Sequence, residues 1–84
     1  MYQILKKKTL NVNTKLMVID APNVARKAEP GQFIILRVSE DGERIPLTIA
    51  EYDREKGTIT IIFQEVGATT MALGQMNEGD CLHD

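Results

Sequence analysis

The stretch Thr58-Ile-Thr-Ile-Ile-Phe-Gln64 decides the fold, because it alternates polar and apolar side chains more cleanly than any other part of the 84-residue chain. Ile59, Ile61 and Phe63 fall on one face, and the polar side chains fall on the other. A period of two is typical of a β-strand with one buried face. We therefore expect a strand here, with the shorter apolar runs around it as its neighbours in a sheet.

Further short runs predict strands separated by turn residues. They are Met1 to Leu10, Thr14 to Asp20, Gln32 to Val38, Arg44 to Tyr52, and the start of a strand at Cys81 to Asp84. The segment Ala21 to Lys27 could form one helical turn, because proline suits the first helical position, but it is too short for a packed helix and is expected to be a connector. After Gly67 the period changes, which predicts one short helix near residues 68–76. This order predicts an all-β fold: a six-stranded antiparallel Greek-key barrel whose last strand is truncated.

Composition limits the classes of function. The net charge is −2, and apart from Lys6 to Lys8 the cations are dispersed, which argues against a nucleic-acid partner. No apolar run is long enough to span a membrane, so we expect a soluble, cytoplasmic protein with no membrane contact. The single cysteine, Cys81, excludes an internal disulfide or a multi-cysteine metal site built from these residues alone.

The first candidate site is the heptapeptide Arg44-Ile-Pro-Leu-Thr-Ile-Ala50. Pro46 lacks a ladder donor, so it marks an edge, a bulge, or a place where something other than a strand lies alongside. Arg44 could bind phosphate oxygens, and Thr48 could donate a hydrogen bond to a ring nitrogen. An exposed edge strand with no ligand explains the same residues equally well.

The second candidate site is Gly67-Ala-Thr-Thr70, at the junction of the strongest strand and the helix. Helix N-termini present unpaired N–H groups that suit phosphate, and Gly67 permits close approach. The alternative is ordinary helix capping by Thr69 or Thr70.

Taken in order, four segments resemble the FAD-binding barrel of the ferredoxin–NADP reductase superfamily. They are Pro30-Gly-Gln-Phe33, Arg44 to Ala50, Gly67 to Leu73, and Gly79-Asp-Cys-Leu82. The nearest relatives on this pattern are the flavin subunit of NADH-dependent ferredoxin–NADP oxidoreductase (sulfide dehydrogenase) and the electron-transfer subunit of dihydroorotate dehydrogenase. The resemblance covers essentially the whole chain.

The resemblance implies a set of FAD-binding residues: Arg44, Pro46, Leu47, Thr48, Ile49, Gly67, Thr69 and Thr70. In that pattern Leu47 and Thr48 take the ring positions and Arg44 takes the pyrophosphate. Leu47 replaces the usual aromatic residue, so only apolar contact with the ring is expected. Arg44 lies one residue further from Thr48 than usual, which predicts a bulge near Pro46. No catalytic residue and no metal ligand is assigned.

By the same resemblance, residues 1–84 form a C-terminally truncated flavin-binding domain without its NAD(P)-binding domain. NAD(P)H and an iron–sulfur cluster are then expected only in the full-length protein. The partner implied is a larger oxidoreductase subunit, either glutamate synthase-like or a dehydrogenase. The fragment alone is expected to be inactive.

Two other classes of function remain open from the residues. One is a Greek-key binding module for oligonucleotides, although an aromatic content of 5% is low for stacking bases. The other is a non-enzymatic interaction domain. An unfinished last strand would leave an open edge, so we also expect the fragment to self-associate.

Overall fold

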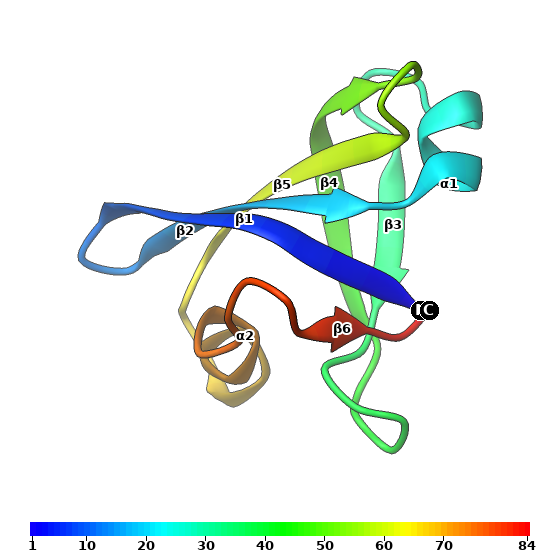
Figure 1. The fold of residues 1–84 in the computed structure, drawn as a ribbon. Coiled ribbons are helices and arrows are strands. Elements are labelled where there is room, and N and C mark those ends of the chain that lie inside the picture. Colours follow the sequence, from blue (N-terminus) through cyan, green and yellow to red (C-terminus); the bar gives the residue numbers. More distant parts are fainter.

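The computed structural model describes all 84 residues as one antiparallel sheet curled into a barrel, with two short helices (Figure 1). The strands are β1 (Tyr2–Asn11), β2 (Thr14–Asp20), β3 (Phe33–Leu36), β4 (Ile45–Asp53), β5 (Thr58–Gln64) and β6 (Cys81–Leu82). Their order across the sheet is β3-β4-β5-β2-β1-β6, which confirms the predicted six-stranded antiparallel fold. The helices are α1 (Pro22–Lys27) and α2 (Ala68–Gly74). Neither helix is long and apolar enough to cross a membrane.

A single bridge joins the two edges of this sheet. Arg37, directly after β3, and His83, directly after β6, exchange backbone hydrogen bonds of 2.8 and 2.9 Å. The Arg37 guanidinium also donates to the Asp84 carbonyl oxygen, from Nε at 2.9 Å and from Nη2 at 2.7 Å. The barrel is therefore closed at one point beside the chain ends, as Figure 1 shows.

The core forms as the alternation in β5 predicts. Ile59, Ile61 and Phe63 are buried, and Ile59 and Ile61 lie opposite Ile19 and Met17 of β2. The polar side chains of β5 point outward, as expected of a sheet with one buried face. Strands β2, β4 and β5 thus each contribute a row of apolar side chains to a common interior.

Helix α1 occupies the segment that the sequence predicts to be a connector. Its six residues are too few for a stable isolated helix. Ala21, Ala25 and Ala28 are fully buried, so packing against the barrel supplies the stability that the short helix lacks. Arg54 adds a hydrogen bond from Nη2 to the Ala28 carbonyl oxygen at 2.8 Å. The expectation of a connector was wrong because tertiary contacts decide this helix.

Gly57, in the turn between β4 and β5, fixes how α1 sits on the sheet. Its carbonyl oxygen accepts a hydrogen bond from the Ala21 N–H at 2.9 Å, and its φ is +70°. A Cβ at this position would lie 2.9 Å from Pro22 Cβ, which no ordinary contact allows. Glycine is required here by both conformation and space.

Gly57→Ala should therefore lower the free energy of unfolding by about 2–4 kcal/mol, from left-handed strain plus overpacking. Gly31→Ala is the matched control, because Gly31 has φ +80° but a methyl group added to it would meet no atom within 4 Å. It should cost only about 1 kcal/mol, for strain alone. Urea unfolding of both variants measures the difference; equal losses would show that the contact with Pro22 does not matter.

Titration of the Tyr2 phenol should make the stability of the barrel depend on pH in the alkaline range. Burial, and then the negative charge of Asp84, raise the pKa of its phenol above the ordinary value of 10.0. The folded protein thus holds this proton to a higher pH than the unfolded chain does. The free energy of unfolding should not depend on the titration of Tyr2 below about pH 9 and should fall as the pH rises past about 10. Tyr2→Phe should flatten this part of the curve, measured by urea unfolding between about pH 8 and 11; an unchanged slope would contradict the assignment.

Candidate functional site

Strand β4 changes its neighbours halfway along its length. Its first half, from Ile45 to Thr48, pairs with β3. Its second half pairs with β5, beginning at the pair Ile49–Ile61, with a bulge between Ile49 and Glu51. On the side away from β3, the first half of β4 has no paired strand, because β5 continues along β2 instead. We call this opening between β4 residues 45–48 and β5 residues 62–64 the fork.

The hydrogen-bond alternation of β4 directs specific backbone groups into the fork. The Ile49 N–H donates to the Gln32 carbonyl oxygen at 2.8 Å, so Ile49 bonds toward β3. In an antiparallel ladder every second residue does the same, which turns the backbone groups of Pro46 and Thr48 away from β3. Pro46, which has no N–H, therefore stands where no neighbouring strand would accept one. This is the setting that the sequence predicts for it.

The side chains of the heptapeptide divide between the two faces of β4. Pro46 and Thr48 are exposed on the outer face, while Leu47 and Ile49 are buried in the core, with exposed fractions of 7% and 2%. Leu47 and Thr48 thus point in opposite directions. A ligand on the outer face would meet the Thr48 side chain but only the backbone of Leu47.

Arg44 lies directly before β4 and is exposed. Its side chain makes no hydrogen bond or ion pair in the chain, since the one ion pair joins Lys15 to Glu65. The bulge expected near Pro46 is absent, because the ladder with β3 runs without a break from Ile45 to Thr48. The bulge lies after Ile49 instead, where β4 exchanges one neighbour for the other.

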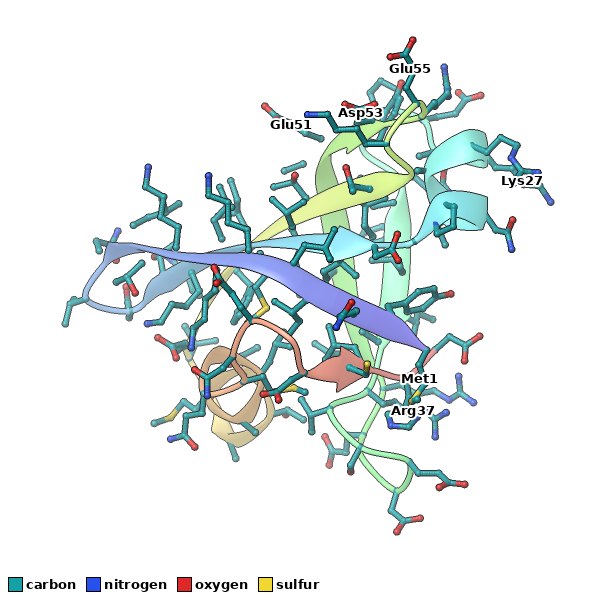
Figure 2. The ribbon with its side chains drawn as sticks, viewed as in Figure 1. Met1, Lys27, Arg37, Glu51, Asp53 and Glu55 are labelled. Carbon is teal, nitrogen blue, oxygen red and sulfur yellow. The ribbon has the colours of Figure 1, made fainter.

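Carboxylates lie at both ends of β4. Figure 2 shows the side chains of Glu51, Asp53 and Glu55 near the turn that follows β4. The loop before the strand carries Glu40, Asp41 and Glu43. Arg37, the other guanidinium of that loop, is already bound to the carbonyl oxygens of Glu40 and Asp84. An anionic ligand at this end of β4 would therefore depend on Arg44 for its positive charge.

The second predicted segment follows β5, the strand on the other side of the fork. The Thr70 hydroxyl oxygen accepts hydrogen bonds from the N–H groups of Val66 at 3.0 Å and Gly67 at 3.1 Å. The same hydroxyl donates to the Gly67 carbonyl oxygen at 3.1 Å. Thr70 therefore acts as a cap of α2, the alternative that the sequence left open, whereas the Thr69 hydroxyl is unoccupied. Leu73 of the same helix is buried and belongs to the barrel core.

Exposed apolar side chains line the outer face around β4. Phe33 and Ile35 of β3 are 66% and 46% exposed and lie opposite Thr48 and Pro46 respectively. Ile62 of β5 is also 46% exposed, on the far side of the fork. The candidate residues of the sequence omit all three. Between residues 32 and 38, the positions on both faces of the strand are apolar, which predicts a strand covered on each face. This signal could have identified Phe33 and Ile35.

Known proteins resemble this chain over nearly its whole length. The chain is 58% identical over all 84 residues to an uncharacterised protein in the adh 3' region of Clostridium beijerinckii, and covers 28% of that protein. It is 39% identical over 82 residues to a Thermotoga maritima homologue of the electron transfer subunit of dihydroorotate dehydrogenase B (NAD(+)), and covers 29% of it. No family model matches the chain.

Similarity to a solved structure also extends over the whole chain. It is an NADH-dependent reduced ferredoxin–NADP oxidoreductase, described in connection with flavin-based electron bifurcation, with a TM-score of 0.96 and 38% identity. The chain covers 30% of that protein. The chain thus spans less than a third of the length of these relatives.

The barrel, its fork and these likenesses define a class, the β-barrel domains of flavoprotein oxidoreductases. Within that class, the chain belongs to the ferredoxin reductase-like family, as the order of its motifs predicts.

The role of Thr70 as a cap can be tested by stability. Thr70→Val keeps the shape of the side chain and removes the three hydrogen bonds, so it should cost about 1 kcal/mol of unfolding free energy. Thr69→Val is the control and should change stability by less than about 0.5 kcal/mol, because its hydroxyl has no partner in the chain. Thermal unfolding of both variants checks this; equal effects would mean that the cap contributes nothing.

Proposed function

We propose that this chain is the FAD-binding domain of an electron-transfer subunit, and that FAD lies on the outer face of β4 along the fork. The observation that carries the proposal is the fork itself. On the side away from β3, the first half of β4 lacks a neighbouring strand, and it contains a proline and presents the Thr48 hydroxyl beside an apolar surface. A strand left open in this way suits a planar ligand with polar edges.

The residues present fit such a ligand. The backbone N–H of Thr48 and its hydroxyl would hold the polar edge of the ring, and Pro46 would give an apolar contact without a competing donor. Leu47 and Ile49 are buried and would support this part of β4 from the core. When bound, the flavin would accept an electron pair and release the electrons to one-electron partners.

The phosphate groups of the ligand would be held at two places. Arg44 offers a guanidinium with no other partner, and a charge-assisted pair with phosphate is among the stronger hydrogen bonds. Gly67 would let a phosphate approach the backbone closely, and Thr69 would offer it a free hydroxyl. Thr70 would contribute indirectly, by holding the Gly67 backbone in place through its cap.

The activity of the whole protein is proposed from the relatives. Their names connect NAD(+), NADH or ferredoxin with electron transfer. We propose that the full-length protein passes electrons between NAD(P)H and a ferredoxin or iron–sulfur partner. This requires an NAD(P)-binding domain, an iron–sulfur cluster and a larger oxidoreductase subunit, glutamate synthase-like or a dehydrogenase. A single cysteine and no disulfide are compatible with cytoplasmic work.

Titration with FAD tests the site. FAD should raise the melting temperature of the chain, because binding to the folded state alone stabilises it. Arg44→Ala should weaken FAD binding by about 1.5–3 kcal/mol, or roughly 10- to 150-fold in Kd. Arg26→Ala, on α1, is the control and should leave the affinity unchanged. In the full-length protein, Thr48→Val should slow flavin reduction while leaving the fold intact.

No thermal response up to about 1 mM FAD would speak against binding by this chain. If Arg44→Ala and Thr48→Val both keep wild-type affinity and reduction rate in the full-length protein, the residue assignment is wrong. A non-enzymatic interaction module would be favoured only if the full-length protein also failed to bind flavin.

A further inference from the structure

The last residues of β5 are held by a neighbouring strand on one side only. All of β5, from Thr58 to Gln64, pairs with β2, whereas its pairing with β4 stops at Ile61. Residues 62–64 thus form one wall of the fork without pairing to the other wall. Paired strands lie about 4.8 Å apart, so a wider gap between β4 and β5 needs contacts that hold this end of β5 toward β2.

Glu65, the residue directly after β5, makes such contacts. Its N–H donates to the Asn13 carbonyl oxygen at 2.7 Å, which extends the β2–β5 ladder by one hydrogen bond. Its carboxylate oxygen Oε1 accepts a hydrogen bond from Lys15 Nζ of β2 at 2.8 Å, in the only ion pair of the chain. The side chains of Glu65 and Lys15 are only 16% and 14% exposed, so most of the solvent is kept from the pair.

Gly74, at the end of α2, leaves the space that the Glu65 carboxylate occupies. A Cβ added to Gly74 would lie 2.6 Å from Glu65 Cδ and closer still to Oε2. The φ of Gly74 is not positive, so its backbone conformation does not require glycine. Glycine is also less favourable than alanine in a helix. Space for the Glu65 side chain therefore explains this glycine, and the carboxylate is fixed between β2 and α2.

We propose that Lys15, Glu65 and Gly74, which we call the β5 anchor, hold the end of β5 against β2 and so set the width of the fork for its ligand, a role that rests on the FAD site proposed above. Lys15 lies opposite the buried Phe63, in a row where an apolar pair would stabilise the fold as well as an ion pair does. What the ion pair adds is direction, because it draws the Glu65 carboxylate toward β2 and away from β4.

The width of the fork matters to a planar ligand because Thr48 turns its backbone N–H into it. That N–H can donate to the polar edge of a ring only while β5 stays far enough away to leave room for the ring. Ile62, exposed on the β5 wall, lies three residues before Glu65 and is placed by the same anchor. A displaced β5 would close on Thr48 or withdraw Ile62, and either change weakens binding without any contact between the anchor and the ligand.

The Kd of the full-length protein for FAD, measured with anchor variants, tests this role. Glu65→Gln and Lys15→Met each break the ion pair and should raise the Kd roughly tenfold. The double variant Lys15→Met/Glu65→Leu puts an apolar pair in its place, which should restore the melting temperature while the Kd stays raised. A pair that only stabilised the fold would recover both. Lys8→Met is the matched control, since Lys8 is exposed on β1, and it should leave the Kd unchanged.

A second measurement uses the contact with Gly74. Gly74→Ala should raise the Kd for FAD by a similar factor, because the added methyl group displaces the Glu65 carboxylate. In a Glu65→Ala background, which leaves room for that methyl group, Gly74→Ala should have no further effect on the Kd.

Three results would each overturn the positioning role: an unchanged Kd in Gly74→Ala, equal effects of Gly74→Ala in both backgrounds, or recovery of affinity by the apolar pair. Failure of the FAD site itself gives a different result. If the wild-type protein binds no FAD, the proposed function and the anchor's role fall together. If the wild-type protein binds FAD and Glu65→Gln binds it equally well, only the role of the anchor is wrong.

Discussion

The pairing of Ile49 governs the arrangement of this barrel. Its N–H bonds to Gln32 before β3, while on its other side it faces Ile61 of β5, and its side chain is buried. Because backbone groups alternate along a strand, this one residue determines which groups of β4 face β3 and which face the fork. The same alternation, carried across the ladder, directs the backbone groups of Phe33 and Ile35 away from β4.

Much of the fold could be predicted from short-range pattern. The bounds of β2 and β5 agree with the sequence prediction because their apolar period is regular. The start of the helix after Gly67 was also predictable from the change of period. Helix α1 was not, because its six residues are helical only by virtue of three buried alanines that pack against elements distant in the chain.

The candidate site was predictable in outline but not in orientation. The sequence identifies Pro46 as the mark of an unpaired position, since proline lacks a donor wherever it occurs. It does not reveal that the bulge follows Ile49, because that position depends on where β5 leaves β4. For the same reason the inward direction of Leu47 and the capping by Thr70 could be learned only from the register and the local hydrogen bonds.

The meeting of the two chain ends has a mechanical consequence. Tyr2 pairs with Leu82 and Gln3 with Cys81 in antiparallel fashion, so residues 1 and 84 lie at the same corner of the barrel. A force that pulls the ends apart would load these rungs one after another, as a zipper opens, rather than all at once as in shear. The Arg37–His83 bridge, at the same corner, would bear load early. The barrel would therefore yield first at its seam, at low force, while the β2–β5 ladder stays intact.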